Sequence, residues 1–229
     1  MPERIRSHPL IVLGGAFFAW VAGVINMVGL LSATHSAVSH MTGTISHLVE
    51  SGFTGNPGLA VRTGTMLLSF VSGAAISGAV TSGGSLSFRR RYGVLVFLEG
   101  LLLLLASYCF RSSNAIAGEA LCALVCGMQN GMVTIVSGAI VRTTHLTGIV
   151  TDIGTHLGQV LRGGTLHWNR MRLHLGILVG FCAGGFMAGL LFYQWEYVLL
   201  DGLAGMLILI GATYMLVRHL RPDWLPGRG

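Results

Sequence analysis

Six long apolar runs, separated by short polar segments, dominate the pattern of hydrophobic and polar positions along this chain of 229 residues. The runs cover residues 9–31, 58–81, 93–112, 117–140, 173–193 and 198–217. A helix needs about 20 residues to cross the roughly 30 Å of hydrocarbon in a bilayer, and each run has about that length. The pattern predicts an all-α membrane protein with six transmembrane helices. Because the spans use most of the chain, we expect a single integral membrane domain over residues 1–229, surrounded by the lipid bilayer.

The pattern of the first half recurs in the second half. Four short phrases return in the same order: GVIN (23–26) as GMQN (127–130), HMTGTISHL (40–48) as HLTGIVTDI (145–153), FVSGAAISG (70–78) as FCAGGFMAG (181–189), and LEGL (98–101) as LDGL (200–203). They define a first repeat of about residues 9–112 and a second of about residues 117–218. Three spans are an odd number, so the second copy must enter the membrane from the opposite side. The sequence thus predicts two inverted three-helix repeats, with a binding site at their interface. The alternative is a duplication that binds nothing.

The repeated polar phrases lie in two short segments, residues 38–53 and 143–161, each after the first span of its repeat. If the first segment spanned, the RRR triplet at 89–91 would move to the side opposite the other basic clusters. We therefore expect each segment to be a short broken helix, either re-entrant or interfacial. Ser and Thr favour helix starts and Gly permits an abrupt turn, so the break is predicted at Thr42–Gly43. Ordinary capped surface loops are the alternative.

Small residues recur every four positions in the second and fifth spans. They are Thr65, Ser69, Gly73, Ser77 and Thr81 in one span, and Gly176, Gly180, Gly184 and Ala188 in the other. Small side chains at this spacing let two helix backbones approach closely in lipid. The stripes predict helix–helix contacts, with a pore lining as the alternative.

Composition supports this picture. Charged residues make up 10% of the chain, and mean hydropathy is +0.72. The net charge of +6 comes from arginines that cluster beside alternate span ends, which places both termini in the cytoplasm and does not indicate nucleic-acid binding. The four cysteines, Cys109, Cys122, Cys126 and Cys182, all fall within predicted spans and do not suggest a disulfide framework. No nucleophile elbow, phosphate loop or dinucleotide motif is found, so we do not expect an enzyme.

The polar groups within this apolar frame are the candidate solute-binding residues. They are Asn26, Thr42, Gly43, Gln129, Asn130, Thr147 and Gly148. Helix starts at the two phrases would direct unpaired N–H groups toward a polar or anionic solute. A buried amide needs a partner, so hydrogen bonding between helices is the alternative role for Asn26, Gln129 and Asn130.

Ionisable residues within spans are candidates for proton coupling. Glu99 and Asp201 occupy matching positions in the two repeats, near the starts of the third and sixth spans. Asp152 stands in the second phrase where His47 stands in the first, so that only one half would titrate near neutral pH. The alternative is that these carboxylates are structural partners for arginine.

Three histidines raise a metal or haem alternative. His40 and His145 match between the phrases, and His47 follows His40 by about two helical turns. The spacing is not that of a common zinc motif, and no cysteine or carboxylate cluster completes a ligand set. We therefore expect no cofactor, while an intramembrane redox or metal protein using these histidines stays an alternative.

The chain resembles the YoaK family, bacterial inner-membrane proteins grouped under a domain of unknown function. The resemblance covers nearly the whole chain and rests on AGVINMVGLL followed by HMTGT, on LEGLLLLL, and on CGMQNGMV followed by RTTHLTG. It implies a bacterial inner-membrane protein of about six helices. The chain differs where relatives often have an acidic residue, here Asn26, and where their phrase ends in Asn, here Thr44.

The function that these features favour is a small permease for a small polar or anionic solute, with proton coupling as an option and a homodimer as the expected form. A non-transporting membrane scaffold is the remaining alternative. The sequence names neither the solute nor the direction of transport.

Overall fold

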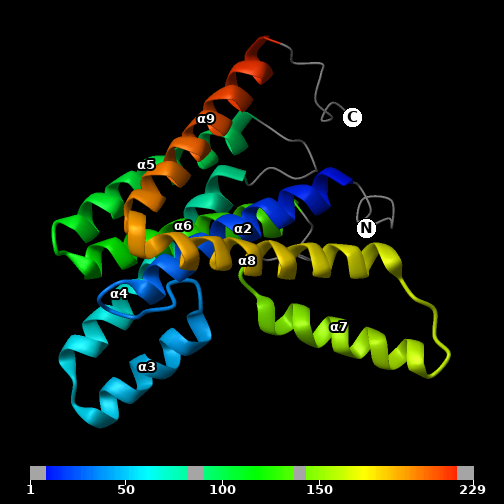
Figure 1. Cartoon of the computed structure of the whole chain (residues 1–229), viewed down its shortest axis with the longest axis horizontal. Coiled ribbons are helices and arrows are strands. Elements are labelled where there is room, and N and C mark those ends of the chain that lie inside the picture. The colour runs from blue at the N-terminus through cyan, green and yellow to red at the C-terminus, as the bar shows by residue number, and fades with distance from the viewer. Residues whose placement is uncertain (1–8, 82–89, 137–142, 221–229) are drawn as a thin grey trace.

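The computed structural model describes residues 9–81, 90–136 and 143–220, and all regular structure in these residues is helical (Figure 1). The helices are α2 (Pro9–Leu31), α3 (Met41–Thr54), α4 (Pro57–Thr81), α5 (Arg90–Arg111), α6 (Ala115–Val136), α7 (Leu146–Leu161), α8 (Trp168–Trp195) and α9 (Val198–Leu220). Within the described ranges, α2, α4, α5, α6, α8 and α9 are long and apolar enough to cross a membrane. The all-α class and the six apolar spans predicted from the sequence are confirmed.

The predicted spans differ from the helices mainly at their ends. α8 begins at Trp168, before the predicted start at residue 173, because its first turn carries polar residues that an apolar pattern does not register. The predicted 117–140 span ends among residues 137–142, outside the described ranges. Arg4, Arg6, Arg89, Arg142, Arg221 and Arg228, which contribute to the predicted orientation, also lie outside them.

The turn between α3 and α4 shows how local sequence separates a short helix from a span. Gly55 adopts a left-handed conformation with φ of 61° and ends α3, a conformation that costs glycine little. Asn56 Oδ1 then accepts a hydrogen bond from the Leu59 N–H, and Pro57 occupies the first position of α4. Proline suits this position because its missing N–H would have no partner in the helix. Two helices thus meet at a sharp turn.

α2 and α8 lie side by side and run in the same direction. Gly180 lies against the backbone of Ala16, and Gly184 lies against the backbone of Trp20. A Cβ on Gly184 would lie 2.1 Å from the carbonyl oxygen of Trp20, so the carbonyl occupies the space that a side chain would need. The small residues of α8 therefore form a helix contact, as their spacing predicts.

α4 and α6 make the corresponding contact and also run in the same direction. A Cβ on Gly73 would lie 2.0 Å from the Leu124 carbonyl oxygen, and a Cβ on Gly127 would lie 2.0 Å from the Phe70 carbonyl oxygen. Each glycine thus receives a carbonyl of the facing helix. The predicted helix-contact role of the α4 stripe is confirmed at Gly73.

α5 and α9 pack against each other in opposite directions. Gly93 lies against Gly211 near one end, Gly100 lies against Ala204, and Ser107 donates a hydrogen bond of 2.9 Å to the Tyr197 carbonyl near the other end. The hydrophobic core lies among the long helices and includes Val21, Ile25, Leu103, Met128 and Leu207. The six long helices therefore form the body of the molecule.

α3 and α7 project from this body, α3 beside α4 and α7 beside α8 (Figure 1). Both are short, and both expose large apolar side chains at their ends: Phe53 is 89% exposed and Leu161 is 88% exposed. The two predicted short segments, 38–53 and 143–161, are thus helices separate from the long ones.

Candidate functional site

The chain breaks before α3 and α7, at the two repeated polar phrases. The residues directly preceding the helices are His40 and His145, and neither side chain caps its helix with a hydrogen bond. Thr42 and Gly43 lie within the first turn of α3, so the predicted break at Thr42–Gly43 is wrong. The chain already turns before His40, and the threonines follow the helix start instead of capping it.

The glycines of the two phrases make room for an imidazole ring. A Cβ on Gly43 would lie 2.6 Å from His40 Nδ1, and a Cβ on Gly148 would lie 2.5 Å from His145 Cε1. Each ring therefore lies over the first turn of the helix that it precedes. The glycine recurs in both phrases because a side chain at this position would displace the histidine ring. The turn itself does not require a glycine there.

Two asparagines hold the breaks in place. Asn26 Oδ1 accepts hydrogen bonds from the Ser39 N–H at 3.2 Å and from the Ser39 hydroxyl at 2.8 Å. Asn130 Oδ1 accepts them from the Thr143 hydroxyl at 3.0 Å and the Thr144 N–H at 3.3 Å. Ser39 and Thr143 each lie 13 residues after the asparagine that they contact. Both amides thus tie a long helix to the segment that follows it. This role is close to the alternative stated above for Asn26 and Asn130, which was hydrogen bonding between helices.

Both polar phrases line one cavity of about 560 Å³, here called the central cavity. Its lining comprises Ser39, His40, Met41, Thr42, Phe70, Ala74, Asn130, Gly131, Thr134, Ile135, Thr144, His145 and Thr147. Of the predicted solute-binding residues, Thr42, Asn130 and Thr147 lie on its wall. Segments far apart in the sequence therefore share one cavity.

The remaining predicted solute-binding residues lie elsewhere. Asn26 is behind the lining residue Ser39, and Gly148 lies under the His145 ring. Gly43 lines a neighbouring cavity of about 220 Å³ between α3 and α4, here called the α3–α4 cavity. Gln129 is fully buried away from the central cavity lining.

The wall of the central cavity combines apolar surface with hydrogen-bonding groups. Its lining combines hydroxyls, one amide and the imidazoles of His40 and His145, and contains no carboxylate, arginine or lysine among the described residues. α3 and α7 both begin at its wall, and a helix start carries a partial positive charge. Phe70 and Ile135 add apolar surface. This lining suits a small polar or anionic solute.

His40 and His145 both line the central cavity, but the three histidines of the metal alternative do not form one cluster. His40 also lines the α3–α4 cavity with His47, but His47 Nδ1 pairs with Glu50 Oε2 at 2.9 Å. His145 belongs to the other phrase, beside Gly148. Across the described ranges, no group of three or more His, Cys, Asp or Glu side chains could hold a metal ion. The ligand set His40, His47 and His145 thus lacks the required geometry.

Gln129 pairs with the proton-coupling candidate Glu99. Both side chains are fully buried, and Gln129 Nε2 donates to Glu99 Oε2 at 3.2 Å. Glu99 Oε1 and Gln129 Oε1 have no hydrogen-bond partner among the described atoms. The sequence predicts Gln129 beside Asn130 in the site, but adjacent helix residues face different directions.

Asp201 occupies a different environment from its counterpart Glu99. Asp201 Oδ2 lies 2.8 Å from Arg111 Nη1, in a partly exposed ion pair between α5 and α9. This geometry matches the arginine-partner alternative. The matching sequence positions of Glu99 and Asp201 therefore do not share surroundings.

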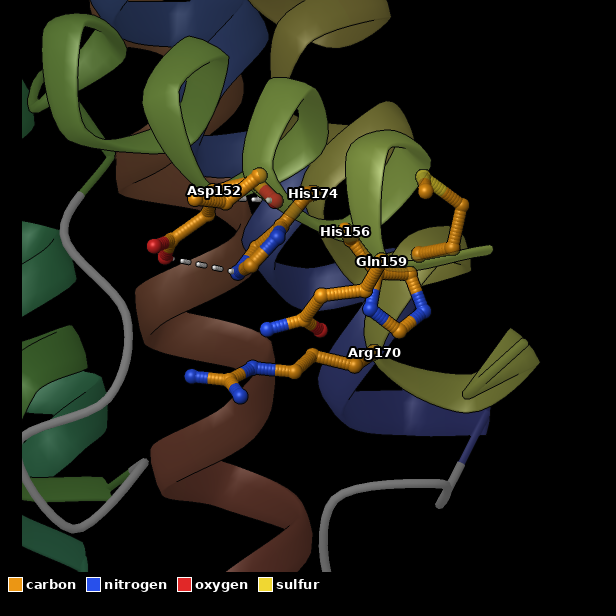
Figure 2. A pocket seen from close by; sticks show the side chains of 7 residues that line it. Asp152, His156, Gln159, Arg170 and His174 are labelled. Carbon is orange, nitrogen blue, oxygen red and sulfur yellow. Dashed lines mark hydrogen bonds and ion pairs between the residues drawn. The ribbon is translucent and has the colours of Figure 1, made fainter. Parts of the chain in front are cut away.

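Asp152 lies beside a histidine that the sequence analysis did not single out. His174 Nε2 of α8 is 3.6 Å from Asp152 Oδ2 of α7, and Figure 2 shows both side chains in a pocket between these helices. This α7–α8 pocket has a volume of about 200 Å³. A histidine within an apolar span was the available signal for His174.

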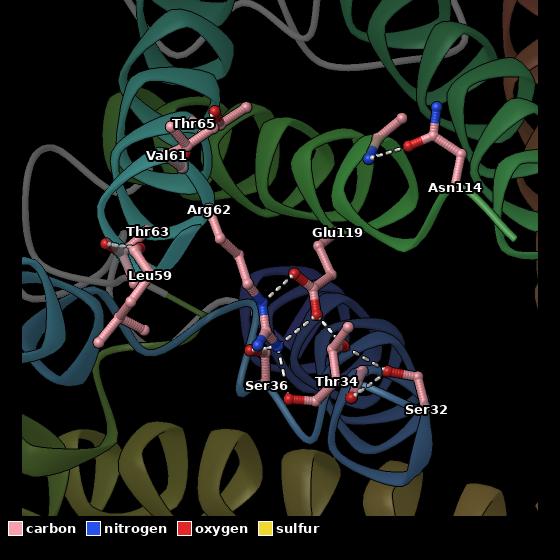
Figure 3. Close-up of polar contacts among 12 residues, drawn as sticks. Ser32, Thr34, Ser36, Leu59, Val61, Arg62, Thr63, Thr65, Asn114 and Glu119 are labelled. Carbon is pink, nitrogen blue, oxygen red and sulfur yellow. Dashed lines mark hydrogen bonds and ion pairs between the residues drawn. The ribbon is translucent and has the colours of Figure 1, made fainter. Parts of the chain in front are cut away.

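A second missed feature is a buried ion pair that joins α4 to α6 (Figure 3). Arg62 Nε donates to Glu119 Oε2 at 2.8 Å, and Arg62 Nη2 donates to Glu119 Oε1 at 2.8 Å. The same guanidinium donates to the Thr34 carbonyl at 2.5 Å and to the Ser36 hydroxyl. The Thr34 hydroxyl also donates to Glu119. The pair thus anchors the segment that leads from α2 to His40.

Comparisons with known proteins identify a family and no activity. No curated protein and no solved structure matches the chain. Residues 14–213 match the model of the family described as DUF1275, protein of unknown function. The more specific resemblance to the YoaK family stays a prediction. Since the matched residues cover most of the chain, the chain belongs to the DUF1275 family of proteins of unknown function.

Proposed function

We propose that the chain is a small multi-pass permease that binds a small polar or anionic solute in the central cavity. The observation that carries this proposal is the meeting of the two polar phrases, with Thr42 and Thr147 on one cavity wall. A cavity lined by donors within a bundle of long apolar helices provides a place where a polar solute is sheltered from lipid.

The proposal includes two inverted three-helix repeats around this cavity. Helix contacts at corresponding positions support them. A Cβ on Gly127 would meet the Phe70 carbonyl oxygen at 2.0 Å, and a Cβ on Gly23 would meet the Phe181 carbonyl oxygen at 2.2 Å. Gly23 corresponds to Gly127, and Phe70 to Phe181, in the repeated phrases. The first span of each repeat therefore packs on the second long helix of the other repeat.

Helix directions support short helices that do not cross the membrane. Consecutive spans alternate in direction, so α5 and α9 would be parallel if α6, α7 and α8 all crossed. They are antiparallel, and α7, at about 24 Å, is the shortest of the three. If α7 does not cross the membrane, α2 and α8 can be parallel only when α3 does not cross it either. We infer that α3 and α7 are re-entrant from opposite sides.

The orientation follows from the arginines. We place the protein in a bacterial inner membrane with both termini in the cytoplasm, because the basic clusters then lie on one side. For a chain of this size we also propose a homodimer as the working form.

Thr42→Val combined with Thr147→Val is expected to abolish solute binding and uptake. Valine keeps the shape of threonine but removes the hydroxyl that a polar solute would contact. A thermal-shift panel of small carboxylates, other anions and neutral polar metabolites on the detergent-purified protein first identifies the solute by selective stabilisation. Uptake of that solute into proteoliposomes then compares the variant with the unmodified protein.

The matched control is Thr54→Val combined with Thr151→Val. These threonines lie on the same two helices, are exposed, and donate hydrogen bonds to their own helix backbones. The control pair should retain binding and uptake. Unchanged uptake in Thr42→Val/Thr147→Val, with normal membrane insertion, would exclude the central cavity as the solute site.

We place proton coupling at Glu99. Its carboxyl is fully buried with one amide donor, and burying an unpaired charge is far more costly than burying a neutral acid. Glu99→Gln is expected to abolish the response of uptake to an imposed proton gradient while leaving solute-induced thermal stabilisation intact. Asp201→Asn, at the partly exposed pair with Arg111, serves as the control and should keep the response. Proton-driven uptake that survives in Glu99→Gln would contradict this assignment.

A further inference from the structure

The α7–α8 pocket has opposite charges at its two ends. Asp152 supplies a carboxylate with half of its side chain exposed, and Arg170 supplies a guanidinium. No described carboxylate lies within ion-pair distance of Arg170. Gln159 lies near Arg170, and Figure 2 shows the side chains of Asp152, Gln159 and Arg170 extending to the same side of the pocket. The pocket therefore presents an acceptor end and a donor end to one ligand.

Asp152 and Gln159 lie on one face of α7, and Arg170 lies on α8. Asp152 and Gln159 are two helical turns apart, a rise of about 10 Å. His174 is buried beside Asp152, with its Nε2 3.6 Å from Asp152 Oδ2, while the His156 ring accepts a hydrogen bond from the His167 N–H. A primary ammonium joined to an oxyanion by a two-carbon linker carries one donor group and one acceptor group on a short ligand, as a pocket with both kinds of end requires.

The surroundings of the pocket indicate a lipid. Trp168, at the start of α8, is 55% exposed, and tryptophan is enriched where spans reach the lipid headgroups. Leu157, Leu161 and Leu166 are exposed on α7 and the turn that follows it. These apolar side chains offer a surface for acyl chains beside a polar pocket for a headgroup. Pockets between membrane helices with basic side chains commonly bind lipid headgroups.

The first repeat lacks this combination. Its corresponding α3–α4 cavity contains His47, which occupies the position of Asp152 in the phrase and pairs with Glu50. The arginine on α4, Arg62, is directed to the buried Glu119 instead. Of these two corresponding cavities, the α7–α8 pocket is thus the one with both charged ends.

We propose that the α7–α8 pocket binds the phosphoethanolamine headgroup of a membrane lipid, with the ammonium on Asp152 and the phosphate on Arg170 and Gln159. Guanidinium groups bind phosphate through paired hydrogen bonds, and a carboxylate accepts hydrogen bonds from a primary ammonium. A choline headgroup has the same phosphate but no N–H to donate. The site is separate from the central cavity, and the lipid is not the transported solute.

The test uses the full-length protein in detergent with short-chain phosphatidylethanolamine, phosphatidylcholine and phosphatidylglycerol. Affinities are measured by thermal shift and by retention of lipid in native mass spectrometry. We expect phosphatidylethanolamine to bind about tenfold or more tightly than phosphatidylcholine, which corresponds to at least about 1.4 kcal/mol. Equal binding of these two lipids, or tightest binding of phosphatidylglycerol, would overturn the proposal. Free phosphoethanolamine that binds as tightly as the lipid would also overturn it, since a soluble ligand would then suffice.

Variants assign the two ends. Asp152→Asn should remove the preference for phosphatidylethanolamine over phosphatidylcholine, whereas Arg170→Gln should weaken both by about tenfold. Arg172→Gln is the matched control, because Arg172 is exposed on the same helix and does not line the pocket. Loss of lipid binding in Arg172→Gln equal to that in Arg170→Gln would show a general charge effect and overturn the site. The lipid series on the unmodified protein tests the proposal even if Asp152→Asn fails to fold.

Discussion

Arg62→Met should destabilise the folded protein by about 3–5 kcal/mol, the usual effect of removing one partner from a buried ion pair. Glu119 is fully buried and receives two hydrogen bonds from Arg62. Without the guanidinium, its carboxylate keeps only the Thr34 hydroxyl as a described donor. The Thr34 carbonyl and the Ser36 hydroxyl also lose their partner, so the segment leading to the central cavity loosens. Thermal unfolding in detergent measures the loss.

Two variants separate charge burial from general damage. Arg62→Met combined with Glu119→Met removes both charges and should restore part of the lost stability, because no uncompensated charge remains. Arg111→Met breaks the partly exposed pair with Asp201 and should cost less than about 1 kcal/mol. Equal destabilisation by Arg62→Met and Arg111→Met would contradict the role assigned to the buried pair.

Gly73→Ala should destabilise the protein by about 3 kcal/mol or more, because the new methyl group has no space. Its Cβ would lie 2.0 Å from the Leu124 carbonyl oxygen, which belongs to the backbone of α6 and cannot turn away. α4 and α6 must then separate, with loss of their packing contacts. The expected result is a melting temperature lower by about 6–12 °C, with a reduced yield of monodisperse protein.

Gly78→Ala is the matched control on the same helix. No atom lies within 4 Å of a Cβ at Gly78, so alanine should leave stability unchanged or raise it through its better helix propensity. If Gly73→Ala and Gly78→Ala had the same effect, close contact between α4 and α6 would not explain the glycine.

The recurrence of HMTG as HLTG predicted that two distant segments contribute to one site, and both do line the central cavity. The same recurrence misled the prediction of the break point. Glycine at Gly43 was taken for a turn residue, whereas it accommodates the ring of His40. A sequence phrase identifies a residue that must be small, but it does not tell which neighbour requires the space.

Pairwise contacts between distant residues were the least predictable part of the site. Gln129 and Asn130 are adjacent in sequence, yet one pairs with Glu99 on α5 and the other with Thr143 and Thr144. Similarly, Arg62 and Glu119 are 57 residues apart and carry no shared motif. Such pairs depend on the rotation of each helix about its axis, which a local pattern does not specify.

The amino-acid sequence by itself determined the all-α class, the six apolar spans and the duplicated polar phrases. Hydrocarbon requires a run of about 20 apolar residues for each crossing, and that requirement is local and readable along the chain. Only the tertiary structure decided which polar groups share the central cavity, which carboxylates have a partner, and that Asp152, Gln159 and Arg170 meet in one pocket. These relations arise where helices far apart in sequence come within hydrogen-bond distance, and packing of the small residues between helices sets that distance.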